Sequence, residues 1–294
     1  MQDILSNRMI LSTTPPIPFI DFGGSGQMIH FSHANGYPPT CYDPLLTFLN
    51  KNYHVVSMLQ RPLWPDSNPE EIIDWHPLSK DLLSFLDQQS INSTIAIGHS
   101  LGGINSLRAA ILEPYRFNAL ILIDPVLFIP RVILARRLIW SLDLVYRFHP
   151  FIKATRYRRR EFLNRESVVE GFRTKPVFRY MDETSLQAYV KGITTPKPEG
   201  GFKLTFSPEW EMRIYATGIW HDMDLWRNMH VLKIPVLIIR GSESNTFLRA
   251  SAKLFKNRLP SARVITIENS THLVPLERPE AVYKTIDQFL QENL

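Results

Sequence analysis

The chain has 294 residues, of which 44% are hydrophobic and 21% charged, a composition typical of one large or two ordinary globular domains. No apolar run approaches the roughly 20 residues that span a bilayer, and the first eight residues lack the pattern of a secretory signal, so we expect a cytoplasmic protein. The net charge is +5, but residues 131–179 alone carry thirteen basic and four acidic side chains, a net charge of +9.

The first 125 residues alternate between predicted strands and helices. Strands are predicted at 17–22, 28–33, 53–59, 95–97 and 119–125, and helices at 42–49, 74–87 and 101–113. This alternation predicts a parallel sheet that helices cover on both faces. We expect no intramolecular disulfide, because Cys41 is the only cysteine, and no metal, because no Cys/His pattern has zinc spacing.

The alternation stops at Val126 and resumes near the end of the chain. Residues 126–231 have a helical pattern and are aromatic and basic, whereas 235–241 and 263–267 read as strands and 248–258 and 279–290 as helices. The simplest architecture is an α/β core of residues 1–125 and 232–294, with residues 126–231 inserted as a helical cap.

One stretch of the chain predicts a nucleophile. The apolar run Ile95–Ile97 leads into Gly98-His99-Ser100-Leu101-Gly102-Gly103, and a segment rich in Leu, Ala and Arg follows. A serine between a strand and a helix in this pattern sits on a sharp turn that exposes its Oγ above the sheet edge. The N–H groups at the start of the helix then point at any negative charge that forms there.

This elbow, the Asp124-Pro125 that ends a later strand and the late His272-Leu273-Val274-Pro275 together resemble the α/β-hydrolase superfamily. The resemblance implies that Ser100 is the nucleophile and that His272 is the base that takes its proton. It also implies that His99 faces away from the elbow apex and has a structural role. Since the nucleophile is a serine, epoxide hydrolases and haloalkane dehalogenases, which use aspartate, are poor matches.

The acid that orients the histidine has two candidates. Many relatives carry an aspartate in the loop after the strand that matches 235–240, but Ser244 and Asn245 occupy those positions here. Asp124 lies at the end of the preceding strand, where haloalkane dehalogenases and some other capped relatives carry their acid. Glu243 lies in the usual loop, one or two residues early. We favour Asp124, because carboxyl ends of parallel strands converge on one site.

The resemblance also implies an oxyanion hole and a substrate pocket. One backbone donor should be Leu101 N–H, and the other should come from the loop His33–Pro38, which resembles a His-Gly-x-Pro loop with two extra residues. On that match the second donor is Tyr37 N–H, and Gly36 permits a close approach. His33 and Trp64 are candidates to line the substrate pocket, although bracing the loop is the more ordinary role for His33.

The predicted cap helix Val132–Phe148 is apolar over most of its circumference and carries a narrow stripe of Arg136, Arg137, Asp143 and Arg147. It either packs on the core as the roof of an apolar pocket or acts as an interfacial lid that contacts an anionic membrane. No nucleic-acid-binding motif accompanies the basic residues.

The sequence therefore predicts a cofactor-free serine hydrolase that acts on a small ester with an apolar moiety. Carbon–carbon bond hydrolysis with the same residues is an alternative. A non-catalytic ligand-binding or membrane-associated protein of the same fold is a second alternative, suggested by the absence of an acid from the usual loop.

Overall fold

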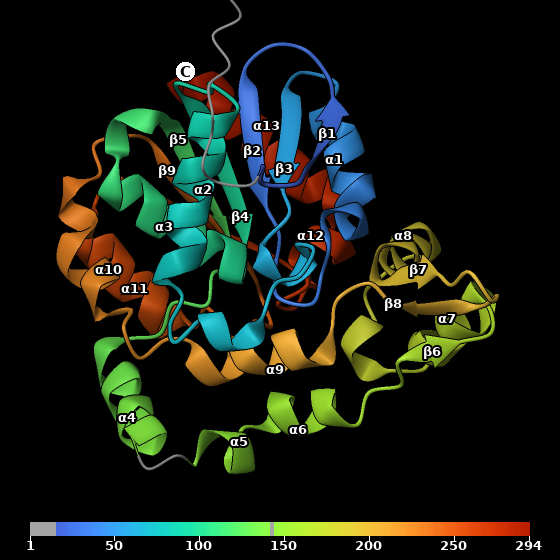
Figure 1. The fold of residues 1–294 in the computed structure, drawn as a ribbon. Coiled ribbons are helices and arrows are strands. Elements are labelled where there is room, and N and C mark those ends of the chain that lie inside the picture. The colour runs from blue at the N-terminus through green and yellow to red at the C-terminus, as the bar shows by residue number, and fades with distance from the viewer. Residues whose placement is uncertain (1–15, 142–143) are drawn as a thin grey trace, which may run out of the picture.

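The computed structural model describes residues 16–141 and 144–294, and Figure 1 shows its fold. The start of the chain, where no secretory signal is predicted, and Leu142 and Asp143 of the predicted cap helix lie outside the described residues. None of the helices in the described ranges is long and apolar enough to cross a membrane.

Seven strands of the described chain form the central sheet, in the order β1-β3-β2-β4-β5-β9-β10. Only β1 runs antiparallel, along β3, and the other neighbours are parallel, which confirms the predicted sheet. The strands are β1 (Phe19–Gly23), β2 (Met28–Ser32), β3 (His54–Met58), β4 (Thr94–His99), β5 (Phe117–Ile123), β9 (Val236–Gly241) and β10 (Arg263–Ile267). The apolar central strands β4, β5 and β9 are buried almost throughout, as expected of a sheet covered on both faces.

Helices pack on both faces of this sheet, and each face has its own apolar cluster. One face carries α2 (His76–Gln88), α3 (Leu101–Leu112) and α11 (Arg249–Arg258), with residues such as Leu82, Ile104 and Phe255 buried. The other carries α1 (Asp43–Leu49), α12 (Val274–Glu277) and α13 (Pro279–Asn293). This arrangement brings the carboxyl ends of β2, β4, β5 and β9 to one edge of the sheet.

The segment between β5 and β9 contains helices and also a small antiparallel sheet that the sequence analysis did not predict. Its helices are α4 (Pro130–Ser141), α5 (Val145–Phe148), α6 (Pro150–Arg156), α7 (Arg165–Arg173), α8 (Glu183–Ile193), α9 (Pro208–Thr217) and α10 (Met223–Asn228). The small sheet has the order β6-β8-β7, from β6 (Glu161–Phe162), β8 (Phe202–Leu204) and β7 (Thr194–Pro196). Strands of two or three residues are too short for an alternating pattern to reveal.

Side-chain caps begin α7, where the Asn164 side chain accepts from Ser167 N–H (2.9 Å), and also α8 and α9. The Asp182 carboxylate accepts from Ser185 N–H (2.7 Å) at the start of α8, and the Ser207 hydroxyl accepts from Trp210 N–H (3.2 Å) at the start of α9. The two helices then bury apolar side chains against opposite faces of the core: Trp210 of α9 in one cluster and Tyr189 of α8 in the other. The inserted segment is therefore fixed to the core at two places, while its exact domain boundaries stay a prediction.

The single long helix predicted over Val132–Phe148 is wrong, because α4 ends at Ser141 and α5 begins at Val145. The Ser141 hydroxyl donates to the Leu138 carbonyl (2.8 Å), a local bond of the kind that competes with helix continuation. Ile133 is buried, but Leu138 is 63% exposed, so this segment is not simply packed on the core.

Candidate active site

Ser100 lies on the sharp turn between β4 and α3, with backbone angles of φ 56° and ψ −116°. A non-glycine residue rarely adopts a positive φ, and surrounding contacts must maintain it. Ser100 N–H donates to the Ile123 carbonyl of β5 (3.0 Å), which ties the turn to the neighbouring strand. Gly102 lets the helix approach β2, since a Cβ there would lie 2.0 Å from the Ser32 carbonyl oxygen. These contacts therefore maintain the strained turn and hold the Ser100 side chain at the sheet edge.

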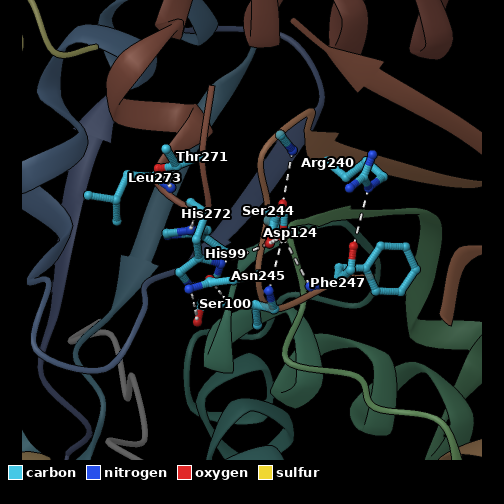
Figure 2. A network of polar contacts seen from close by, with 12 residues as sticks. His99, Ser100, Asp124, Arg240, Ser244, Asn245, Phe247, Thr271, His272 and Leu273 are labelled. Atoms are coloured by element: carbon cyan, nitrogen blue, oxygen red, sulfur yellow. Dashed lines mark hydrogen bonds and ion pairs between the residues drawn. The ribbon is translucent and has the colours of Figure 1, made fainter. Parts of the chain in front are cut away.

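His272 contacts Ser100 from a loop between β10 and α12 (Figure 2). Its Nε2 lies 2.9 Å from Ser100 Oγ, and its Nδ1 lies 2.8 Å from an oxygen of the Asp124 carboxylate. Since a carboxylate only accepts hydrogen bonds, Nδ1 carries the proton and Nε2 accepts from the serine hydroxyl. This tautomer is the one in which an imidazole can remove the serine proton.

Asp124 directly follows β5 and its side chain is completely buried. Three donors satisfy its carboxylate: His272 Nδ1–H, the Ser244 hydroxyl (2.6 Å) and Gly241 N–H (2.9 Å). Figure 2 shows Ser244 and Asp124 beside the histidine. A buried charge needs such partners, and together they fix the plane of the carboxylate relative to the imidazole.

The alternative acid, Glu243, has other partners. Its carboxylate accepts hydrogen bonds from Arg179 and from the Tyr180 hydroxyl (2.5 Å), and its side chain is 45% exposed. These hydrogen bonds, first from Tyr180 and then from Arg179, lower the pKa of Glu243. The structure thus brings Ser100, His272 and Asp124 together and leaves Glu243 at the surface, joined to the inserted segment.

His99 takes part in the site in a way that the sequence analysis missed. Its Nε2 lies 2.9 Å from the His272 carbonyl oxygen and its Nδ1 lies 2.7 Å from the Tyr42 hydroxyl. Burial lowers the pKa of His99 well below its usual value, so the ring is neutral, donates from Nε2 and accepts from Tyr42. The Tyr42 hydroxyl also accepts from Ala34 N–H (3.3 Å). His99 thus links the His272 loop to the loop after β2, although no spacing in the sequence connects these residues.

Of the two predicted oxyanion donors, one is placed as expected and the other is engaged elsewhere. Leu101 is the first residue of α3, so its N–H has no acceptor within the helix. Tyr37 N–H instead donates to the Ala34 carbonyl (3.2 Å), closing a tight turn in which Gly36 has φ +77°. Tyr37 N–H and Ala34 N–H both have acceptors. The backbone N–H groups of Asn35 and Gly36 are therefore the candidates in this loop for the second oxyanion donor.

An ion pair between the buried Glu211 and the partly exposed Arg158, both from the inserted segment, lies beside this loop. The Glu211 carboxylate of α9 accepts from both terminal nitrogens of Arg158 (2.6 and 3.0 Å) and from the Thr155 hydroxyl (3.2 Å). A Cβ at Gly36 would lie only 3.1–3.4 Å from that carboxylate, and the Asn35 side chain donates to the Glu211 carbonyl (3.2 Å). The turn therefore leaves no room for a side chain between Gly36 and the Glu211 carboxylate, and Asn35 ties it to α9.

The two predicted pocket residues use their polar groups to hold loops. His33 is fully buried; its Nδ1 donates to the Ala34 carbonyl (3.0 Å) and its Nε2 accepts from Gln60 N–H (3.1 Å). A pocket-lining role for His33 is therefore wrong. The Trp64 indole N–H donates to the Leu59 carbonyl within its own loop. In the described part of the chain, no group of three or more His, Cys, Asp or Glu side chains could hold a metal ion.

The sequence model described as the Alpha/beta hydrolase family matches residues 31–285. A 2-(acetamidomethylene)succinate hydrolase from Mesorhizobium japonicum is 23% identical over 269 residues, 91% of this chain and 89% of that protein. The esterase YbfF from Escherichia coli is 23% identical over 228 residues, 76% and 77% of the two chains. The crystal structure of E-2-(acetamidomethylene)succinate hydrolase gives a TM-score of 0.74 at 20% identity, covering 93% of this chain and 94% of that one.

Proposed function

Because this chain belongs to the alpha/beta hydrolase family, we propose that it is a serine hydrolase that cleaves a carboxylic ester through an acyl-enzyme intermediate. The observation that carries the proposal is the hydrogen-bonded series from Ser100 through His272 to Asp124, with distances of 2.9 and 2.8 Å. A serine hydroxyl is a weak nucleophile unless an adjacent base removes its proton, and this series supplies that base.

In the first half of the reaction, Ser100 Oγ attacks the ester carbonyl carbon while His272 Nε2 takes the hydroxyl proton. The tetrahedral intermediate then collapses, and the imidazolium passes that proton to the departing alcohol. In the second half, a water attacks the acyl-enzyme with His272 again as base, and Ser100 regains its proton as the acid product leaves. Asp124 orients the imidazole and stabilises the imidazolium through its hydrogen bond to Nδ1.

The negative oxygen of the intermediate needs backbone donors at the same sheet edge. Leu101 N–H at the start of α3 is one, and it has the positive end of the helix dipole behind it. We assign the second to the turn Ala34–Tyr37, through Asn35 or Gly36 N–H, in place of Tyr37 N–H. In this assignment Glu211 is a positioning residue, because its contact with Gly36 fixes the turn that carries the donor.

The inserted segment would act as a cap that selects the substrate. The apolar character of α8 and α9 favours an ester with an apolar acyl or alcohol part, and one relative carries the name esterase. Carbon–carbon bond hydrolysis remains the alternative chemistry, since it uses the same three side chains. The non-catalytic alternative was suggested by a missing acid, and the contact of Asp124 with His272 weighs against it.

The proposal is tested by covalent labelling with a fluorophosphonate probe. The folded protein should form one adduct, on Ser100, and lose p-nitrophenyl ester hydrolysis as the adduct forms, whereas Ser100→Ala should remain unlabelled. A panel of p-nitrophenyl esters with increasing acyl length, run beside a diketone, separates ester from carbon–carbon cleavage. Absence of any adduct on Ser100 in folded protein would refute the enzyme proposal.

A further inference from the structure

The outer face of α4, α5 and α6 combines exposed apolar side chains with unpaired basic ones. We propose that this face docks onto the surface of a membrane that contains anionic phospholipids. We call it the α4–α6 face, and its described members are Leu134, Leu138, Ile139, Tyr146, Phe148, Phe151, Arg131, Arg137, Arg147, Lys153 and Arg156. The inference depends on this surface alone and not on the proposed chemistry.

The apolar part of the face is large for a protein surface. Six large hydrophobic side chains within 18 positions are 38–64% exposed, the highest being Leu138 at 63% and Phe148 at 64%. Single exposed leucines are ordinary, but a contiguous group of leucine and aromatic side chains marks an interaction site. Figure 1 shows α4, α5 and α6 following one another along the lower edge of the molecule, with α9 between α6 and the core.

Buried side chains on the inner side hold the three helices in place. Ile133 of α4, Val145 of α5 and Ile152 of α6 are all buried in the apolar cluster that includes α9. Each helix therefore turns one side toward the protein and leaves the other side with its leucine and aromatic residues in solvent. The exposed side chains therefore belong to helices that are packed on the protein and not to unpacked ones.

Among the described residues of 131–160, the basic part of the face has no acidic neighbour in the sequence. Residues 131–160 contain nine basic residues and one acidic one, Asp143, which lies outside the described residues. Further along the same segment, Arg158 and Arg160 pair with carboxylates of α9, at 2.6 Å each. Among the described residues, Arg131, Arg137, Arg147, Lys153 and Arg156 form no ion pair, so their charge is available to an external anion.

The combination of both kinds of residue selects the partner. A second copy of this chain would bring two strongly positive faces together, and like charges repel. A nucleic acid would satisfy the arginines but would leave the leucine and phenylalanine side chains in water. An anionic bilayer surface satisfies both groups, because apolar side chains enter the boundary below the headgroups and each nearby basic residue contributes about 1 kcal/mol.

The test is co-sedimentation of the full chain with phosphatidylcholine vesicles, with and without about 30% phosphatidylglycerol. We expect binding to the anionic vesicles only, and its loss when the salt concentration rises. The double variant Leu134→Ser/Leu138→Ser should bind about tenfold more weakly, and Arg131→Gln/Arg137→Gln about thirtyfold more weakly. All these side chains are exposed, so the variants should fold, which circular dichroism checks.

The matched controls carry equivalent changes elsewhere on the surface. Leu112→Ser/Tyr115→Ser removes two exposed apolar side chains (52% and 75% exposed) outside the face, and Arg173→Gln/Arg263→Gln removes two exposed, paired arginines. Both controls should bind vesicles like the parent chain. The proposal is wrong if anionic vesicles do not bind, if the controls weaken binding equally, or if light scattering shows that the apolar residues of the face hold a dimer together.

Discussion

The Ser244 hydroxyl lies 2.6 Å from the same Asp124 oxygen that accepts the hydrogen bond from His272 Nδ1. The Ser244 oxygen itself accepts from Thr246 N–H (3.2 Å) and Phe247 N–H (3.1 Å), so its own hydrogen is directed at the carboxylate. The loop after β9, where relatives are expected to carry the acid, thus contributes a donor to an acid on β5. Because Asp124 accepts from His272 and Ser244 only donates to Asp124, substitutions of the two residues should have different effects on activity.

Asp124→Asn should abolish most of the activity, whereas Glu243→Gln should not. An amide in place of Asp124 stabilises the wrong imidazole tautomer, which lowers kcat by roughly 10³–10⁴-fold in enzymes of this kind. Glu243 pairs with Arg179 and Tyr180 at the surface, and exposed pairs contribute little, so we expect a change of at most about twofold. Steady-state ester hydrolysis gives both values, and a larger loss in Glu243→Gln would contradict the assignment.

Ser244→Ala should lower kcat by about tenfold, because a hydrogen bond to a buried carboxylate contributes about 1.5 kcal/mol or more. The nucleophile and base remain in place, so KM should not change. Fluorophosphonate should still label Ser100, but at a lower rate. Asn245→Ala is the matched control, since Asn245 is the exposed neighbour in the same loop. Equal kcat values for the two variants would show that Ser244 does not support Asp124.

Tyr42→Phe should reduce kcat more than a comparable hydroxyl loss elsewhere. The Tyr42 hydroxyl donates to His99 Nδ1, and His99 Nε2–H donates to the His272 carbonyl. Loss of the Tyr42 hydroxyl therefore weakens the contacts that fix the backbone of the catalytic His272. We expect a loss of roughly tenfold in kcat with little change in KM. Tyr53→Phe removes a hydroxyl that donates to Asp287 (3.0 Å) in another part of the core and should leave kcat unchanged. If Tyr42→Phe and Tyr53→Phe lowered kcat equally, Tyr42 would have no specific role in positioning His272.

The sequence predicted those parts of the molecule that follow from local patterns. Apolar runs and glycines in the sequence predict the strand, turn and helix around Ser100 and the parallel sheet. The structure contains both features. The contacts of Tyr42 with His99 and of Ser244 with Asp124 join residues 57 and 120 positions apart, and no periodicity signals them. The Tyr37 assignment failed because its N–H donates to the Ala34 carbonyl across a turn that the resemblance to a His-Gly-x-Pro loop does not contain.

Acid should destabilise the fold well before carboxylates protonate. Burial lowers the pKa of His33 to about 4 and that of His30 to about 3. Below pH 6.5 the unfolded chain therefore takes up protons that the folded chain does not, so the free energy of unfolding decreases as pH falls. Each histidine contributes up to about 1.4 kcal/mol per pH unit until its folded pKa is reached. Urea unfolding at pH 7, 6 and 5 measures this slope, and a flat profile over that range would contradict it.

Glu211→Gln should lower kcat by roughly tenfold at nearly constant KM, because the contact of Glu211 with Gly36 orients an oxyanion donor and not the bound substrate. The amide keeps the volume but leaves Arg158 without its carboxylate. Glu209→Gln is the control on the same helix, since the Glu209–Arg160 pair is about half exposed on both sides.

Gly36→Ala supplies an independent test of the same contact. The new Cβ would lie 3.1 Å from the Glu211 carboxylate carbon and would stand on a residue with φ +77°, so the turn must shift. If the turn and the ion pair act as one unit, the two substitutions remove the same orientation and their effects on kcat should be strongly non-additive in the double variant. Additive effects, or a fall in kcat for Glu209→Gln equal to that for Glu211→Gln, would show that the inserted segment does not position the oxyanion loop through Glu211.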